Sequence, residues 1–327
     1  MVKRGVEVFT RQTLRQTGLS DSTLTRQVKS GHLLRLRPGR YVNRRAWEQL
    51  SLKGHHITRT RAIAQPNGRL IATRESAALA HGLPVCFIPS NVHVIAREAQ
   101  SHQLSGVVVH QCIGFPTEYV TAIDDIRALT RAATVVSCAR HADLRTALMV
   151  IDAELRARLQ FGPSHGEPPE VTQSRNEEIK ELRVELLTLN ELLPGRRGKA
   201  VARRLIKLGN PLAESPLESL GRAVIIRAGL PIPELQVEIR GSDGRLYRMD
   251  GAYRNQRVAI EFDGRIKYFG DLGDPDMVAY QEHLRQTAIG NRGWRVVRTS
   301  WNELIHHPEA FINALRNALE EQNRRVA

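Results

Sequence analysis

Three acidic residues near the end of the chain have the type and spacing that could support chemistry. They are Asp250, Glu261 and Asp263, in the stretch RMDGAYRNQRVAIEFDG. Two alternating apolar segments, 246–252 and 257–263, flank a turn-like segment, which predicts a β-hairpin. Glu261 and Asp263 are two residues apart and should share one face of their strand. Carboxylates that converge at a sheet edge could hold Mg²⁺ or Mn²⁺, the ions that assist phosphodiester hydrolysis.

The same acids admit a second interpretation. They could be ordinary solvated carboxylates on an exposed hairpin, since most acidic side chains in proteins are exposed. However, Glu261 lies between Ile260 and Phe262 and is followed by Asp-Gly. An acid between two large apolar residues is less usual on a solvated hairpin, so the sequence favours a functional site.

Length and composition indicate a soluble protein of several domains. The chain has 327 residues, 41% of them hydrophobic and 25% charged, enough for two or three domains with separate cores. No apolar run reaches membrane-spanning length, and the N-terminus lacks the apolar stretch of a signal peptide. We therefore expect a cytoplasmic protein without a membrane partner. Cys86, Cys112 and Cys138 lack metal-ligand spacing and are expected to be core thiols.

The positive charge is concentrated at the N-terminus. The net charge is +14, and residues 1–50 hold eleven basic and three acidic residues, a local surplus of eleven minus three, or +8. Only seven of the 48 basic residues are lysine, which codon bias could explain. Codon bias does not explain why the charge gathers in one segment. Such a patch indicates a nucleic-acid partner, because cationic side chains displace counterions from phosphates.

The first 50 residues predict a helix-turn-helix. After Phe9 and Thr10, a helical stretch to Thr17 should end at Gly18, a typical C-terminal stop. Ser20 and Asp21 can cap a second helix that runs to about Ser30. Two short helices joined by Gly-Leu-Ser suit a DNA-binding helix-turn-helix.

A basic hairpin is expected to follow these helices as a wing. Its first strand, 33–37, alternates so that Leu34 and Leu36 should be buried while Arg35 and Arg37 are exposed. Pro38 and Gly39 then form a turn, and 40–42 the return strand. The alternative is a small helical cap with a solvated basic hairpin. We expect the contacts with nucleic acid to come from Thr23, Arg26, Lys29, Arg35, Arg37 and Arg40.

The rest of the chain predicts three further segments, which gives an α/β multidomain fold. After a winged helix-turn-helix in 1–54, residues 55–161 favour a mixed α/β domain, with 133–137 among its strands. Its histidines show no repeated metal-ligand spacing. Residues 162–210 begin with the breaker GPSHGEPP and continue as charged helices. Residues 211–327 read as helix, hairpin, strand, helix, strand and helix.

The N-terminal half resembles AbiEi-type antitoxins of abortive-infection toxin–antitoxin systems. The likeness lies first in GLSDSTLTRQVKSGHLLRLRPGRYV, which is similar to their winged helix. It continues through ATRESAALAHGLPV, NVHVIA and VIDAELR within residues 71–155. These are glycine, turn and apolar positions, which specify a fold better than an activity. The resemblance implies DNA binding and a possible cognate toxin protein as partner.

The final segment resembles the Vsr-like branch of the PD-(D/E)XK nucleases. The likeness lies in SPLESLGRAVIIRAGLPIPELQ, RMDGAY, VAIEFDGRIKY and EHLRQTAIGNRGWRVVRTSW. It implies a restriction-endonuclease-like α/β/α domain. Glu218 would be the helical acid behind the site, Asp250 a metal-ligating acid and Glu261 the acid of the D…ExK motif. On local grounds alone, Glu218 would complete a capping box with Ser215.

One position departs from the nuclease motif. Asp263 stands two residues after Glu261, where the core motif has lysine. Related Vsr-like sequences often have an aspartate there too. An aspartate can bind metal but cannot act as the cation that orients water. Lys267 could reach back in that role. Glu282 and Arg285 are three apart on a helix and share a face, which could pack against the site. The alternative, which the sequence slightly favours, is a surface ion pair.

Two hypotheses for function follow. The first is a cytoplasmic protein that binds double-stranded DNA and cuts it with Mg²⁺ or Mn²⁺. Its metal ligands would be Asp250, Glu261 and Asp263, and its catalytic residues these three with Glu218 and Lys267. The second is a non-enzymatic antitoxin or transcriptional repressor whose nuclease-like domain is inactive. An RNA substrate also remains open, because nothing in the sequence reads the sugar.

Overall fold

The structure is a computed structural model that forms two compact units. It describes residues 5–96, 102–112, 114–159, 169–264 and 275–326. The N-terminal unit comprises residues 1–154 with 168–209, and the C-terminal unit comprises residues 155–167 with 210–327. Within the described residues, no helix is both long and apolar enough to cross a membrane.

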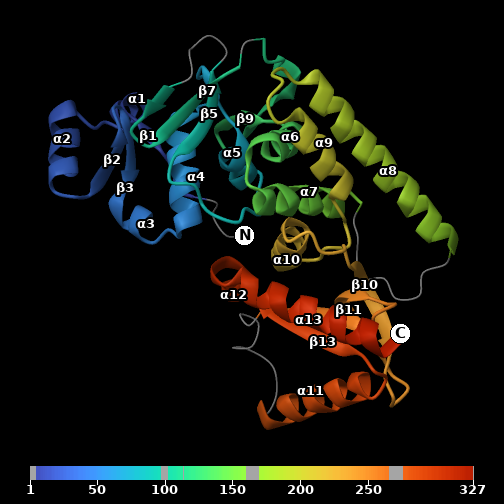
Figure 1. Ribbon diagram of the computed structural model, residues 1–327. Coiled ribbons are helices and arrows are strands. Elements are labelled where there is room, and N and C mark those ends of the chain that lie inside the picture. The colour runs from blue at the N-terminus through green and yellow to red at the C-terminus, as the bar shows by residue number, and fades with distance from the viewer. Residues whose placement is uncertain (1–4, 97–101, 113, 160–168, 265–274, 327) are drawn as a thin grey trace. The chain divides into compact units, whose positions relative to one another are not determined.

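The N-terminal unit begins with a small module of three short helices and a three-stranded sheet, which we call the basic module (residues 9–48; blue in Figure 1). Its elements are β1 (Phe9–Thr10), α1 (Arg11–Gln16), α2 (Asp21–Lys29), β2 (Leu33–Arg37), β3 (Arg40–Asn43) and α3 (Arg44–Glu48). The strands form a sheet in the order β1-β3-β2. The predicted order of helix, helix and wing is therefore present.

Local signals define the first two helices of the basic module. The Thr10 hydroxyl accepts a hydrogen bond from the Thr13 amide at the start of α1. The Ser20 hydroxyl caps α2 by accepting from the Thr23 amide at 3.2 Å. Gly18 follows α1 with a positive φ of 88°, a conformation that suits glycine because it has no Cβ. Both predicted helix boundaries are confirmed to within two residues.

The predicted burial of the first wing strand was wrong. Leu33 is only 7% exposed and packs with Leu14, Leu24 and Tyr41, whereas Leu34 and Leu36 are half-buried. The cause is tertiary, since Leu24 of α2 covers the strand face that carries Leu33. Arg35 is exposed as predicted, but Arg37 is half-buried.

A six-stranded mixed sheet follows the basic module, in the order β6-β7-β5-β4-β9-β8. Its strands are β4 (Leu70–Ala72), β5 (Val92–Ala96), β6 (His102–Leu104), β7 (Val107–Gln111), β8 (Val120–Ile123) and β9 (Ile126–Leu129). The accompanying helices are α4 (Leu52–Ile63), α5 (Arg74–Ala80), the 3-10 turn η1 (Thr117–Tyr119), α6 (Arg131–His141), α7 (Leu144–Arg158), α8 (Pro169–Leu192) and α9 (Lys199–Leu208). Apolar side chains of α4, α5 and the sheet, such as Ile57, Leu79 and Val94, form its core.

The predicted strand at 133–137 was wrong, because these residues lie in α6. Residues 133–140 of this helix are all buried, with α5, α8 and α9 packed against it. A helix buried on all sides shows no polar face. Without that period, the β-branched run Thr134–Val136 resembled a strand.

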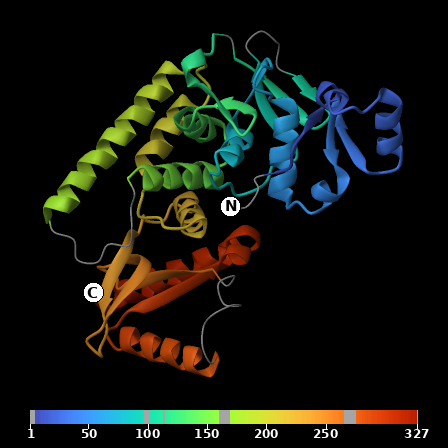
Figure 2. The ribbon, with the colours of Figure 1, turned by 180° about the vertical axis from the view of Figure 1, so that it is seen from behind.

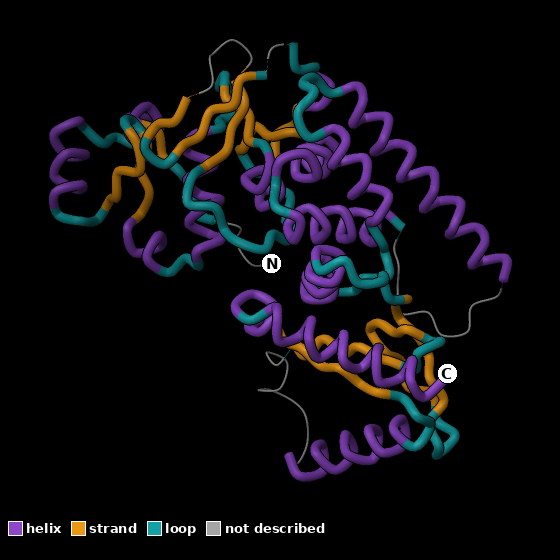
Figure 3. Tube along the Cα trace, in the orientation of Figure 1, coloured by secondary structure: helices purple, strands orange, loops and turns teal. Residues whose placement is uncertain are grey.

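The C-terminal unit is a four-stranded sheet between helices (Figure 2, Figure 3). Its strands are β10 (Glu234–Arg240), β11 (Leu246–Tyr253), β12 (Val258–Asp263) and β13 (Arg295–Ser300), paired in that order. Its helices are α10 (Pro216–Arg227), α11 (Pro275–Gly290), α12 (Trp301–His306) and α13 (Pro308–Val326). Helix α11 covers one face and α13 the other. The β11–β12 hairpin is antiparallel and β13 joins β12 in parallel, as the predicted element order requires.

The contact between α10 and β12 depends on a glycine. Gly221 lies in the middle of α10, and a Cβ at that position would overlap the Phe262 ring. The same ring packs against the ring of Phe311 of α13, and the two ring centroids are 6.4 Å apart. Glycine usually weakens a helix, so here its cost is offset by the close approach of the aromatic ring.

We expect Gly221→Ala to destabilise the protein by about 1–3 kcal/mol, because the added methyl group overpacks this contact. Denaturant unfolding would measure the change. In the double variant with Phe262→Leu, the smaller side chain should accommodate the methyl group. The free energy of unfolding lost in the double variant should therefore be less than the sum of the losses in the two single variants. Strict additivity, or a stabilising Gly221→Ala, would contradict the packing described.

Candidate functional site

Helix α2 presents cationic side chains to solvent. Arg26 and Lys29 are exposed on its C-terminal half, and neither has an ion-pair partner in the part of the chain that the structure describes. Thr23 is half-buried, and its hydroxyl lies 2.9 Å from that of Ser20. The helix therefore offers two free charges and one hydroxyl that is already held by its cap.

The two basic residues of α1 share one acid, Asp21, for which the sequence predicted only a helix-capping role. Arg11 Nε lies 2.9 Å and Arg15 Nε 3.1 Å from Asp21 Oδ1. Hydrogen bonds from Arg15 and then Arg11 lower the pKa of Asp21 to about 2. Asp21 is also in the first turn of α2, where its negative charge interacts favourably with the helix dipole. The cations of α2 and the wing that have no ion-pair partner among the described residues are therefore more available to another molecule than the two arginines of α1, which share Asp21.

The wing brings two arginines directly opposite each other. A register shift in the β2–β3 ladder places Arg37 across from Arg40, and like charges at such positions repel. Arg40 is held by Gly39 O at 3.2 Å and by the Gln65 side chain. Among the described residues, neither Arg35 nor Arg37 has an acidic partner. Of the predicted contact residues, Arg40 is thus the one already committed to the protein.

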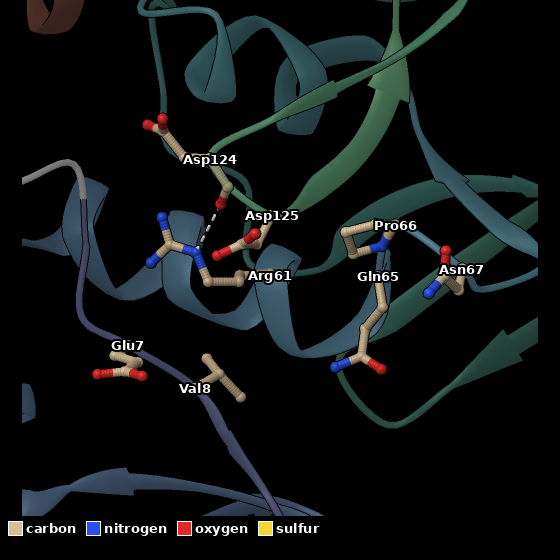
Figure 4. A pocket seen from close by; sticks show the side chains of 8 residues that line it. All are labelled: Glu7, Val8, Arg61, Gln65, Pro66, Asn67, Asp124 and Asp125. Atoms are coloured by element: carbon tan, nitrogen blue, oxygen red, sulfur yellow. Dashed lines mark hydrogen bonds between the residues drawn. The ribbon is translucent and has the colours of Figure 1, made fainter. Parts of the chain in front are cut away.

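A polar cavity of about 580 Å³ lies next to Gln65, between the N-terminal segment that precedes β1 and the β8–β9 turn (Figure 4). Arg61 spans it, donating to Val6 O at 2.6 Å and to Asp124 O at 3.0 Å. Because Gln65 also lines the cavity, its contact with Arg40 connects this cavity to the wing. These contacts fix the segment that enters the basic module.

In the C-terminal unit, Glu218 is a buried acid with two roles. It is 5% exposed, and its amide donates to the Ser215 cap at 3.2 Å. Its Oε2 accepts from the Glu214 amide at 2.8 Å and from Gln236 Nε2 at 3.0 Å. Burial, with a smaller contribution from nearby Asp250, raises its pKa to about 7. The predicted cap is present, and the charge of Asp250 reaches the same carboxyl.

Asp250 connects this helix with the hairpin. Its Oδ2 accepts from the Phe262 amide at 2.7 Å. Its pKa is raised chiefly by burial and also by the charge of Glu261, although the bond from Phe262 opposes the shift. The acids Glu218, Asp250 and Glu261, from α10, β11 and β12, are therefore electrostatic neighbours. Gln236, at a φ of 53° on β10, is a member of this group that the sequence gave no reason to select.

Glu261 is the centre of a closed ring of charges. Its side chain is only 13% exposed, and its two oxygens pair with Arg285 and with Arg298 Nε, the latter at 2.8 Å. Glu282 pairs with the same two arginines. The predicted face shared by Glu282 and Arg285 is confirmed. Arg298 was missed, because its position beside Glu261 comes from the parallel register of β12 and β13.

The proposed metal ligands do not fit a cation as they are arranged. The described residues include no group of three His, Cys, Asp or Glu side chains placed to hold a metal ion. Glu261 is directed to arginines and Asp250 to a backbone amide. Asp263 is half-buried at the end of β12, opposite Ser300 of β13. Lys267 lies outside the described residues.

The raised pKa of Glu218 has a consequence for stability. In the folded protein its pKa of about 7 exceeds the usual 4.5. The contribution of this carboxyl to the free energy of unfolding is therefore fully present below pH 4.5 and is lost as pH rises through 7. Glu218→Gln removes the buried charge and should raise the free energy of unfolding at pH 8 by about 2 kcal/mol, with little change at pH 5. Denaturant unfolding at both pH values would test this. Glu321→Gln, an exposed change on α13, should show no such pH dependence; an equal effect there would contradict the assignment.

Comparison with known proteins bears mainly on the basic module. Two curated relatives are the uncharacterized proteins MT2308 and Rv2248 of Mycobacterium tuberculosis strains CDC 1551 and H37Rv. Each is 29% identical over 287 residues, which is 86% of this chain and 90% of theirs. The crystal structure of the Rv2827c protein from Mycobacterium tuberculosis aligns with 72% of this chain and 80% of its own, at a TM-score of 0.39 and 15% identity. Residues 2–44 match the family described as a transcriptional regulator, AbiEi antitoxin. The chain therefore carries an AbiEi-type antitoxin domain of the transcriptional-regulator family at its N-terminus.

Proposed function

We propose that this protein is a DNA-binding transcriptional regulator that contacts double-stranded DNA through α2 and the β2–β3 wing. The observation that carries the proposal is the set of exposed cations on these two elements. Arg26, Lys29 and Arg35 are exposed and have no ion-pair partner among the described residues. In contrast, the arginines of α1 are paired with Asp21.

The arrangement suits the geometry of a duplex. Helix α2 is the second helix of the helix-turn-helix and has the size to enter a major groove. Arg26 and Lys29 lie three residues apart on it, so both can face the same groove or its phosphates. The facing arginines of the wing, Arg37 and Arg40, gain stability from an adjacent phosphate, because the phosphate offsets their repulsion.

A toxin protein is the proposed protein partner. The basis is the family of residues 2–44, whose description names an antitoxin. An antitoxin that also binds DNA can couple repression of its own gene to the amount of toxin present. The DNA contacts described above occupy only the basic module, which leaves the rest of the chain available for a protein contact.

A second candidate function is phosphodiester hydrolysis by the C-terminal unit with Mg²⁺ or Mn²⁺. It is supported by the element order α10, β10, β11, β12, α11 and β13. It is also supported by the electrostatic interactions of Asp250 with Glu218 and with Glu261. The ring around Glu261 favours the alternative of a domain that does not cut, because both carboxylate oxygens already have guanidinium partners. If the arginines release Glu261, they could neutralise phosphate charge.

The DNA-binding proposal predicts a loss of affinity in Arg26→Ala/Lys29→Ala. Each lost phosphate contact lowers the slope of log K against log salt by about 0.9, so the double variant should lower it by about 2 and weaken binding roughly tenfold or more. Titration of labelled DNA from upstream of the gene, at several salt concentrations, would measure both. Arg69→Ala, an exposed arginine outside the basic module, serves as the matched control. Equal effects of the two substitutions would rule out α2 as the contact helix.

The hydrolysis proposal predicts plasmid nicking by the intact chain with Mg²⁺ or Mn²⁺, lost in Asp250→Asn and in Glu261→Gln. Glu282→Gln breaks the same ionic ring without touching the three grouped acids, so it should retain nicking. Because Glu282 pairs with the same two arginines as Glu261, this variant separates loss of the ionic ring from loss of the acid that would act in hydrolysis. Specific promoter binding without nicking by the wild-type chain, on DNA or RNA, would favour the non-enzymatic regulator.

A further inference from the structure

Arg74 is an unusual residue in the mixed sheet of the N-terminal unit. It is half-buried at the start of α5, directly after β4. Its φ is 50°, a left-handed conformation that non-glycine residues seldom adopt. Strained backbone of this kind is common at binding sites, where the surrounding structure maintains it. The guanidinium of Arg74 forms no ion pair with an acid in the described residues.

Two histidines lie next to Arg74 on neighbouring strands. The Thr73 amide, just before Arg74, donates to His93 O at 3.0 Å, which places His93 across the strand pair. His93 Nδ1 then lies 2.9 Å from His110 Nε2 on β7. One ring must donate in this bond and the other accept. When both rings are neutral, the pair therefore has one further N–H donor and one further acceptor.

A third histidine and a second arginine come from other elements. His141 ends α6, and the charges of Arg74 and Arg197 both act on it. Arg197 lies in the loop between α8 and α9. The buried guanidinium of Arg140 fixes this loop, donating to Pro194 O at 2.8 Å and Leu193 O at 3.1 Å. This group of two arginines and three histidines is thus built from five separate elements.

The charged side chains of this cluster include two arginines, Arg74 and Arg197, which act on the same histidine, and one acid, Glu75, which acts on Arg74. Burial, assisted by the charge of Arg74, lowers the pKa of His93, His110 and His141 to about 4 each. The nearby acid is Glu75, whose own pKa is raised by burial. A half-buried cation is costly without a counter-charge, and no acid among the described residues forms an ion pair with Arg74, although the charge of Glu75 acts on it.

We propose that this cluster binds a phosphate monoester group. A guanidinium offers paired donors that match two phosphate oxygens. The histidine pair offers one donor to a phosphate oxygen and one acceptor for a protonated oxygen, and a monoester carries a charge of about −1.5 to −2 near pH 7, which suits a site with two arginines. The participating side chains are Arg74, His93, His110, His141 and Arg197. The site is separate from α2 and does not depend on the role of that helix in DNA binding.

Calorimetric titration of the full chain with inorganic phosphate tests the proposal. We expect saturable binding that Arg74→Asn weakens at least about tenfold, because a charged hydrogen-bond donor is lost. Asparagine tolerates the left-handed backbone, which limits damage to the fold. The control Arg69→Gln removes an exposed arginine nearby in sequence and should leave binding unchanged. Sulfate, which has no proton to donate at neutral pH, should bind more weakly than phosphate.

His110→Gln provides a second variant on a different strand, should Arg74→Asn fail to fold. It too should weaken phosphate binding. Competition with short duplexes identifies the source of the group: stronger competition by a 5′-phosphorylated duplex than by an unphosphorylated one supports a DNA end. Equal competition by both, with phosphate still bound, supports a small phosphorylated ligand. No saturable phosphate binding by the wild-type chain, or equal losses in Arg69→Gln and the site variants, would overturn the proposal.

Discussion

The carboxylate of Glu261 is bound between Arg285 and Arg298, and the arrangement of the C-terminal unit depends on that contact. One arginine comes from α11 and the other from β13, so a single acid on β12 connects the helix to both strands of the parallel pair. Glu282 closes the ring from the same helix. A carboxylate as little exposed as that of Glu261, at 13%, is costly unless it is paired. The pairing therefore favours one position for α11 across the sheet.

The N-terminal unit meets the same requirement with Arg140. Its buried guanidinium donates to Asn190 Oδ1 at 2.9 Å and to carbonyls at the end of α8, groups that a helix leaves unsatisfied. The loop that follows approaches so closely that a Cβ on Gly198 would overlap the Arg140 backbone. One buried cation thus positions the α8–α9 loop against α6, and with it Arg197.

Local signals made part of this structure predictable. The caps at Thr10 and Ser20, the glycine after α1 and the acidic hairpin at residues 246–263 all involve residues close in sequence, so their physics can be read without a fold. Predictions that depended on distant neighbours were less successful. Leu33 is buried because α2 covers it, and residues 133–137 are helical because other helices surround them.

The features of the candidate site also separate into those set by residues close in sequence and those set by distant contacts. The sequence by itself determined that acids would occur on a hairpin and at the first turn of a helix, because alternation and capping are local properties. Only the tertiary structure decided the pKa values and the ion-pair partners of these acids. Burial raises the pKa of Glu218 and Asp250, and the parallel register of β12 and β13 places Arg298 beside Glu261. Burial and register arise from contacts between residues far apart in the chain, and these contacts set the charge that each acid carries.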